Sequence, residues 1–230
     1  MMTALEEMGT EQTKKVLTRH GAREPFYGVK VGDLKTLMKP LKKDHDMALE
    51  LYKTGVSDAM YLAGLIEDEN KVTRDQLKTW MEEAYWYMLS EYVVAQLAAD
   101  SQYGWELGIG WIESDKEGIA AGGWATLSNV LSVAENENLD KKAILKLLDR
   151  VGNHIHKAQN RVRYAMNGFV IAAGSYLPDL TAKAVEIAKK IGKVEVEMGG
   201  TSCKVPLAEE YIEKVVKADR IGKKRKVARC

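Results

Sequence analysis

The sequence predicts an all-α fold in which pairs of helices stack into a solenoid. Apolar residues recur at helical spacing along nearly the whole 230-residue chain. The segments with this spacing are mostly about 10 to 17 residues long and the breaks between them are short, so successive helices must lie antiparallel. Proline, which interrupts helices, occurs at only four positions.

The spacing predicts a run of helices in the first part of the chain. Leu34, Leu37 and Leu41 share one face of a short helix. Ser57 and Thr73 stand where N-caps belong, because their hydroxyl oxygens can accept the free N–H groups of a first turn. The segments expected to be helical are 3–20, 31–41, 45–52, 57–66, 75–86, 90–100, 103–112 and 116–133.

More regular helices follow the polar loop at residues 135–138. The segments 141–156, 159–176 and 178–190 are expected to be helical, the first with Ile144, Leu148 and other apolar residues on one face. Helix pairs that recur about every 35 to 45 residues indicate a HEAT-type solenoid, with an irregular helical bundle as the alternative. A solenoid has a concave face that can hold an extended ligand such as a duplex.

One segment, at about residues 193–205, breaks the helical spacing and predicts a single inserted β-hairpin near the C-terminus. Apolar and polar residues alternate there on either side of Gly199 and Gly200, and glycine suits the positive φ of a two-residue turn. The expected cross-strand pairs are Val196 with Cys203, Val194 with Val205, and Glu195 with Lys204. Such a hairpin is either a structural flap or a probe that reaches into a groove.

These elements predict one HEAT-like repeat domain over residues 1–218 and a basic tail over residues 219–230. No stretch approaches the roughly 20 apolar residues of a membrane span, and the N-terminus lacks the apolar core of a signal peptide. Two cysteines, Cys203 and Cys230, suit a reducing compartment and are too few for a zinc site. We expect a cytoplasmic monomer that needs no metal, cofactor or membrane.

The net charge of +1 conceals an uneven distribution of charge along the chain. Residues 1–140 contain 14 Lys/Arg and 24 Asp/Glu, whereas residues 141–230 contain 20 Lys/Arg and 9 Asp/Glu. A basic half attracts phosphate groups and raises their local concentration. The distribution therefore predicts a polyanionic partner.

The most informative cluster of cations surrounds the junction between two helices in the basic half. Arg150, His154 and Lys157 share one helix face, and Arg161 and Arg163 open the next helix. A helix N-terminus adds backbone N–H donors and the positive end of a dipole to these cations. We expect this junction to contact phosphates.

The hairpin and the tail supply further candidates for DNA contact. The tail is expected to be loosely ordered and either contacts phosphates or only aids solubility. The candidates in these two segments are Lys193, Lys204, Lys223, Lys224, Arg225 and Lys226.

Four short segments resemble those of a known family. The stretch 27–39 is similar to its short second helix, and 86–94 to its aromatic-acidic segment at a helix start. The Trp-Ile-Glu-Ser-Asp stretch at 111–115 and the Met-Asn-Gly-Phe stretch at 166–169 resemble two further motifs. Their order and spacing resemble the HEAT-like repeat DNA glycosylase superfamily, the AlkD-like DNA alkylation repair proteins, over roughly residues 3–190.

The resemblance implies a C-shaped solenoid whose basic concave face binds duplex DNA. Its glycosylase members excise cationic alkylpurines with an Asp, an Arg and two Trp on that face. Carried over to this sequence, the Asp position is Glu91, one Trp position is Tyr87 with Trp86 beside it, the Arg position is Ala121, and the second Trp position is Phe169. An alanine cannot contact a phosphate or hold a carboxylate in place, so this set resembles a vestigial catalytic site.

The predicted hairpin and the altered site together resemble the divergent AlkF/AlkG-like branch of the superfamily. Members of that branch keep the DNA-binding scaffold, lack the glycosylase residues and favour branched DNA. The expected function is therefore non-catalytic binding to branched or distorted DNA. One alternative is a glycosylase for 3-methyladenine or 7-methylguanine, with Glu91 as its electrostatic stabiliser. The other is a HEAT scaffold that binds a protein.

Overall fold

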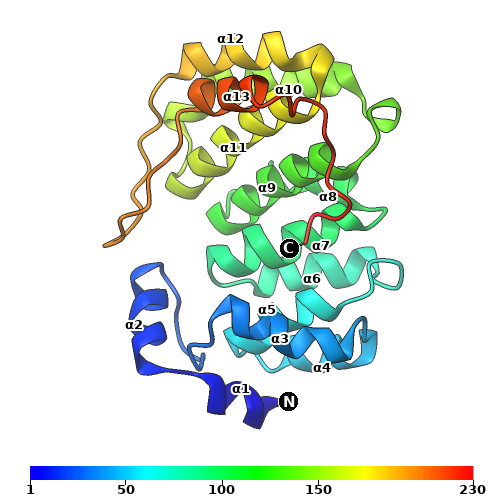
Figure 1. Cartoon of the computed structure of the whole chain (residues 1–230), viewed down its shortest axis with the longest axis vertical. Helices are drawn as coiled ribbons and strands as arrows, with labels where there is room; N and C mark the ends of the chain where they lie inside the picture. Colours follow the sequence, from blue (N-terminus) through cyan, green and yellow to red (C-terminus); the bar gives the residue numbers. More distant parts are fainter. Residues whose placement is uncertain (230) are drawn as a thin grey trace.

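The structure, a computed structural model, describes residues 1–229 and shows helix pairs stacked from one end of the molecule to the other (Figure 1). The N-terminal helices form one end of the stack, and the last two helices form the other end. The α-helices are α1 (Met2–Met8), α2 (Glu11–Arg19), α3 (Val31–Leu41), α4 (His45–Lys53), α5 (Ser57–Ile66), α6 (Arg74–Glu83), α7 (Ala95–Asp100), α8 (Gly104–Trp111), α9 (Glu117–Val133), α10 (Lys141–His154), α11 (Asn160–Tyr176), α12 (Thr181–Ile191) and α13 (Ala208–Lys217). The π-helix η1 (Met88–Val94) precedes α7, and the 3₁₀ turns are η2 (Asn136–Asn138), η3 (Ile155–Lys157) and η4 (Pro178–Leu180).

The helix pairs form two layers. The pairs are α4 with α5, α6 with η1 and α7, α8 with α9, α10 with α11, and α12 with α13. The second members pack on one another in chain order and form an inner layer, in which α11 is buried along most of its length. The outer helix α10 buries only one apolar stripe, which contains Ile144, Leu148 and Val151. The predicted all-α solenoid of helix pairs is confirmed.

One of the two expected helix caps is present. Thr73 caps α6, because its hydroxyl oxygen accepts a hydrogen bond from the backbone N–H of Gln76 at 3.1 Å. Ser57 is not a cap: it is the first residue of α5, and Val56 occupies the N-cap position. The hydroxyl of Ser57 instead accepts a hydrogen bond from the indole N–H of Trp86 at 2.8 Å, which ties α5 to the segment just before η1.

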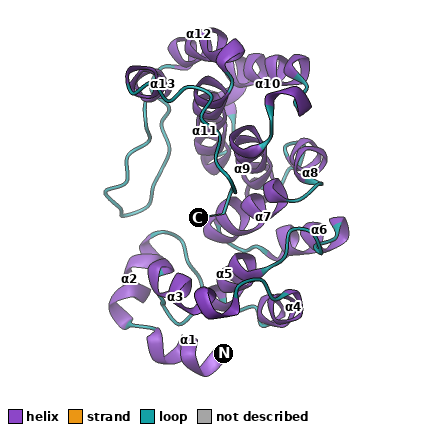
Figure 2. Cartoon of the chain, turned by 45° about the vertical axis from the view of Figure 1, so that its right-hand side comes forward, coloured by secondary structure: helices purple, strands orange, loops and turns teal. Residues whose placement is uncertain are grey.

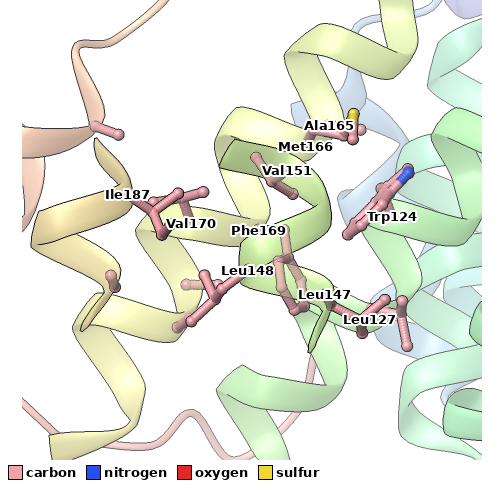
Figure 3. Close-up of a cluster of buried hydrophobic side chains, with 14 of the residues drawn as sticks. Trp124, Leu127, Leu147, Leu148, Val151, Ala165, Met166, Phe169, Val170 and Ile187 are labelled. Atoms are coloured by element: carbon pink, nitrogen blue, oxygen red, sulfur yellow. The ribbon is translucent and has the colours of Figure 1, made fainter. Parts of the chain in front are cut away.

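The core runs between the layers, and Figure 3 shows part of it. Trp124 of α9 and Phe169 of α11 meet edge to face with ring centroids 5.2 Å apart, and both side chains are almost fully buried. Leu148 of α10 and Ile187 of α12 pack in the same cluster. Truncation of a buried Phe or Trp to Ala typically costs about 3–5 kcal/mol, so these contacts hold three successive repeats together.

The predicted β-hairpin is wrong, because the described residues contain no β-strand. Residues 192–207, here called the long loop, extend away from the helices and return (Figure 2). The outgoing and returning segments, its two legs, form no β-ladder with each other. Each leg bonds to α11 instead. The side-chain amide of Asn160 accepts from the N–H of Glu197 at 2.7 Å and donates to its carbonyl at 2.9 Å, as a neighbouring strand would. The amide of Asn167 donates to the carbonyl of Pro206 at 2.9 Å.

Side-chain packing also separates the two legs of the long loop. Val194 is 3% exposed and belongs to the main core, so the first leg is held by the solenoid. Glu195 lies 3.4 Å from the ammonium of Lys193 rather than pairing with Lys204 across the loop. The alternation that predicted a hairpin therefore reflects two legs that each pack on the helices.

The sequence predicts a loosely ordered tail, but in the structure the tail packs against the helices. It descends from α13 along the stack of helices (Figure 1), and residues 222–229 are called the C-terminal strap below. The N–H of Gly222 donates to the carbonyl of Ser175 near the end of α11 at 2.9 Å. The N–H of Arg225 donates to the carbonyl of Ser132 near the end of α9 at 2.8 Å.

The strap ends in a buried cluster of charges. Arg229 donates to Asp100 at 2.9 Å, to the carbonyl of Glu67 at 2.6 Å and to the carbonyl of Gly64 at 3.2 Å, and it also pairs with Glu69. Cations near the C-terminal ends of helices interact favourably with the free carbonyls and the negative ends of the helix dipoles. The strap thus ties the ends of α5, α7, α9 and α11 together. Cys230 lies outside the described residues.

Within residues 1–229, no helix combines the length and the apolar character needed to cross a membrane.

Candidate functional site

A cleft of about 540 Å³ opens at the N-terminal ends of the inner helices η1, α9 and α11. We call it the central cleft. Its walls also include the end of α2 and the tip of the long loop. The charged residues that line it are Arg19, Arg23, Glu82, Glu91, Lys116, Glu117, Arg161 and Glu197. Four cations therefore face four carboxylates, and the formal charge of the central cleft is balanced.

A buried ion pair forms the floor of the central cleft. Arg161, in the first turn of α11, donates from Nε to one oxygen of Glu91 at 2.8 Å and from Nη2 to the other at 2.5 Å. The side chains are 15% and 4% exposed. Glu91 sits in the middle of the π-helix η1, a type of helix that is rare and is often found at functional sites. Both oxygens of this carboxylate are therefore occupied by one guanidinium.

Burial and pairing act in opposite directions on the Glu91 carboxylate. Burial raises the pKa of Glu91, and the hydrogen bonds and the charge of Arg161 work against that increase. Removal of either partner would leave the other as an uncompensated buried charge.

Two tyrosine rings enclose the guanidinium of Arg161. The ring centroid of Tyr87 lies 4.1 Å from its Cζ atom and that of Tyr164 lies 4.5 Å away, within the range of cation–π attraction. The hydroxyl of Tyr87 lies 3.1 Å from Nδ1 of His20, at the end of α2. Partial burial raises the pKa of the Tyr87 phenol, so this ring is a neutral aromatic surface at physiological pH.

The tip of the long loop meets the end of α2 across the mouth of the cleft. Figures 1 and 2 both show the tip beside α2. Gly199 has a φ of +64°, and a Cβ atom there would lie 2.5 Å from the carbonyl oxygen of Arg19. The sulfur of Met198 lies 3.9 Å from the guanidinium of Arg161. The loop therefore covers the ion pair on one side.

The structure brings together only part of the predicted vestigial site. Glu91 and Tyr87 line the cleft, and Trp86 lies beside them with its indole N–H used by Ser57. Ala121 and Phe169 are fully buried in the core, away from the cleft, and Figure 3 shows Phe169 against Trp124. The cation missing at position 121 is supplied instead by Arg161 from the next repeat.

The predicted basic junction is divided by the fold. Arg150 pairs with Glu113 and lies 5.7 Å from the ring centroid of Trp124, whereas Arg161 turns into the central cleft. The backbone N–H of Arg161 donates to the carboxylate of Glu117 at 2.7 Å, so this helix N-terminus is already capped by an anion. Arg163 lies near Asn160 at 3.4 Å, and His154 and Lys157 are exposed.

The other predicted DNA contacts lie on the long loop and the strap. Lys193 and Lys204 are exposed on the loop. On the strap, Lys224 donates to the carbonyl of Leu131 at 2.7 Å, and Arg225 donates to the carbonyl of Ala228 at 2.8 Å. Lys223 and Lys226 are exposed.

The sequence prediction missed the cations that the acidic half contributes to the central cleft. Arg19, His20 and Arg23 surround the turn after α2, and Lys116 is the N-cap residue of α9. The sequence indicates these residues only as cations that stand beside the ends of predicted helices. The excess of carboxylates in residues 1–140 obscured that signal.

Stacked helix pairs with a long, hollowed inner face define a HEAT-like helical-repeat protein. Residues 1–198 match the family described as DNA alkylation repair enzyme, and the chain belongs to that family.

Similar proteins cover nearly the whole chain. An uncharacterized protein of Listeria innocua is 36% identical over 218 residues, which is 92% of this chain and 94% of that protein. One from Listeria monocytogenes is 35% identical over 219 residues, with the same coverage. A solved structure with a TM-score of 0.90 and 37% identity covers 100% of this chain and 97% of its own. It is described as a new family of proteins related to the HEAT-like repeat DNA glycosylases with affinity for branched DNA structures.

Proposed function

We propose that this protein binds DNA without excising bases and that it prefers branched DNA to linear duplex. Membership of the DNA alkylation repair family supports DNA as the partner, and the similar solved structure has affinity for branched DNA. The observation that carries the non-catalytic part is the Glu91–Arg161 pair, in which the guanidinium takes both carboxylate oxygens.

The same pair argues against the alternative of an alkylpurine glycosylase. Such an enzyme needs a carboxylate that faces the positive charge developing on the sugar, and here Arg161 takes that position. A cationic base would also be repelled by the guanidinium. To free Glu91, the protein would have to break a buried pair, which costs about 3–5 kcal/mol.

The central cleft suits unstacked bases better than phosphates. Its charges balance, so it attracts polyanions weakly, but the half-buried ring of Tyr87 lines it. Stacking of a base on an aromatic side chain contributes about 1–3 kcal/mol and tolerates any sequence. A branch point offers bases whose stacking is interrupted, whereas an intact duplex does not. We assign phosphate contacts to the exposed cations outside the cleft, such as Lys157, Lys204 and Lys223.

Binding of labelled four-way junction and of linear duplex of equal length tests this proposal. We expect tighter binding to the junction at low salt. Tyr87→Ala should weaken junction binding about 5- to 100-fold, the equivalent of one lost stacking contact, and Tyr87→Phe should restore it because the ring remains. Linear-duplex affinity should change little in both variants.

Two results would contradict the proposal. Absence of binding to either DNA at low salt would exclude a DNA partner and favour the protein-binding scaffold. Release of 3-methyladenine or 7-methylguanine from alkylated DNA, abolished by Glu91→Gln, would establish the glycosylase instead.

We also propose that the protein acts as a monomer in the cytoplasm. Its inner face is complete within one chain, since η1, α9 and α11 of the same chain line the central cleft. Sedimentation with and without the junction tests the oligomeric state, and a dimer in either condition would contradict it.

A further inference from the structure

A second cleft, of about 410 Å³, lies between the C-terminal strap and the C-terminal parts of α9 and α11. We call it the strap cleft. Its charged lining consists of Arg220, Lys223, Lys224 and Arg225, with no carboxylate among the described residues that line it. It differs in this respect from the central cleft, where cations and carboxylates balance.

Two cations of the strap cleft are available to a ligand. Arg220 and Lys223 are exposed, and neither has an ion-pair partner among the described residues. Lys224 is half-buried beside them. Burial lowers the pKa of its ammonium, and the carboxylates of Glu135 and Glu137 act in the opposite direction. An unpaired positive charge such as that of Arg220 or Lys223 attracts anions more strongly in a concave site than on a flat surface.

Polar and aromatic groups complete the lining. The hydroxyl of Ser175 is buried in the wall of the strap cleft, and it has no hydrogen-bond partner within the part of the chain that the structure describes. Tyr211 also lines the strap cleft, and its side chain is 48% exposed, so its ring is accessible to a ligand. A hydroxyl, several cations and an exposed ring together match the chemistry of a nucleotide phosphate.

The strap cleft and the central cleft lie at opposite ends of the same helix. Arg161 begins α11 in the central cleft, and Ser175 ends it in the strap cleft. Fourteen residues of α-helix span about 21 Å, or roughly six base-pair steps of 3.4 Å. A third hollow of about 360 Å³, lined by Tyr61, Tyr92 and Tyr164, shares residues with both clefts, so the inner face is continuous between them.

We propose that the strap cleft is a phosphate-binding site for the DNA backbone, held by Arg220 and Lys223 at the opposite end of α11 from the central cleft. This inference rests on the proposed function, because it takes DNA as the partner. The cations of the basic C-terminal segment then have two roles. Lys224 and Arg225 bond to backbone carbonyls and hold the strap in place, and Arg220 and Lys223 bind the phosphate.

The test is the salt dependence of DNA binding by Arg220→Ala/Lys223→Ala. Each phosphate contact contributes about 0.9 to the slope of log K against log salt for duplex DNA. We expect the double variant to lower the slope by about 0.9 to 1.8 and to bind both DNA forms more weakly at low salt. Its melting temperature should match the wild type, because both side chains are exposed.

Lys214→Ala/Lys217→Ala is the matched control, since it removes the same charge from exposed positions on α13 that do not line the cleft. Equal losses in the two double variants would overturn the inference, and so would an unchanged slope in Arg220→Ala/Lys223→Ala. Either result would leave the proposed function standing if the wild type binds junction DNA.

A second measurement separates DNA from a free ligand. Titration of inorganic phosphate should shift the amide signals of Ser175 and Tyr211 in the wild type but not in Arg220→Ala/Lys223→Ala. Phosphate-induced shifts in a wild-type protein that binds no DNA would contradict the DNA contact and assign the cleft to a free phosphate compound. Absence of any shift would contradict the site itself.

Discussion

At the scale of single residues, Arg161 connects features that lie far apart in the sequence. It neutralises Glu91, two helix pairs earlier in the stack, stacks between Tyr87 and Tyr164, and lies beside Met198 of the long loop. Its position follows from the start of α11 at the N-terminal edge of the inner layer. Ala121, the residue expected from the resemblance at the arginine position, is buried, and the space in front of the Glu91 carboxylate is occupied by Arg161.

Arg161→Ala should lower the free energy of unfolding by about 3 kcal/mol, because it leaves the Glu91 carboxylate buried without its partner. Arg150→Ala is the control, since it breaks the Arg150–Glu113 pair, whose side chains are 36% and 63% exposed. An exposed pair contributes about 1 kcal/mol or less. Urea unfolding of both variants measures the difference. Equal losses of unfolding free energy would show that the buried pair stabilises the fold no more than the exposed pair.

At the scale of elements, the sequence predicted what repeats locally and missed what depends on distant contacts. The helices followed from apolar spacing, since α10 needs only its own stripe to be recognised. The hairpin prediction was wrong because alternation in residues 193–205 does not show what the backbone there binds. The backbone N–H and C=O of Glu197 bond to the side-chain amide of Asn160 and not to a second strand. The packing of the strap was missed because a run of lysines and arginines carries no local sign that helix ends far away in the sequence would bind it.

The strap makes a specific prediction about stability. Arg229→Ala removes the bonds to Asp100, Glu69 and two helix-end carbonyls, so we expect a loss of about 3 kcal/mol and faster proteolysis of the C-terminal segment. Lys226→Ala, at an exposed position of the same strap, should change the free energy of unfolding by less than about 0.5 kcal/mol. Chemical denaturation of both variants tests this, and a wild-type midpoint for Arg229→Ala would refute it.

Low pH should weaken the ion pair between Arg229 and Glu69. Burial acts to raise the pKa of Glu69, but Lys43 and Arg229 outweigh it, so the pKa lies below the ordinary 4.5. The stability from these pairs is therefore complete above pH 4.5 and is lost as pH falls through the lowered pKa. The difference in unfolding free energy between wild type and Arg229→Ala should shrink on acidification from pH 7 to pH 3. A constant difference would mean that Glu69 does not contribute to the stabilisation by Arg229.

At the scale of the whole molecule, the uneven charge distribution has two roles. Arginines of the basic half pair with carboxylates of the acidic half, as Arg150 does with Glu113, Arg161 with Glu91 and Arg229 with Asp100. Part of the basic excess therefore joins the acidic and basic halves of the chain. This is why the charge distribution predicted a polyanion partner but could not identify the contact residues: sequence alone does not separate paired cations from free ones.

This division of charge predicts different salt responses for folding and for DNA binding. The Arg161 and Arg229 pairs are buried, and salt screens buried pairs much less than exposed ones, so the unfolding midpoint should change little between 50 and 200 mM salt. DNA affinity depends on exposed cations and should fall about a hundredfold over that range if four phosphates are neutralised. Thermal unfolding and fluorescence anisotropy with junction DNA, measured in the same buffers, test both responses. A melting temperature that falls in parallel with affinity would mean that the cations that bind DNA are the same ones that hold the fold together.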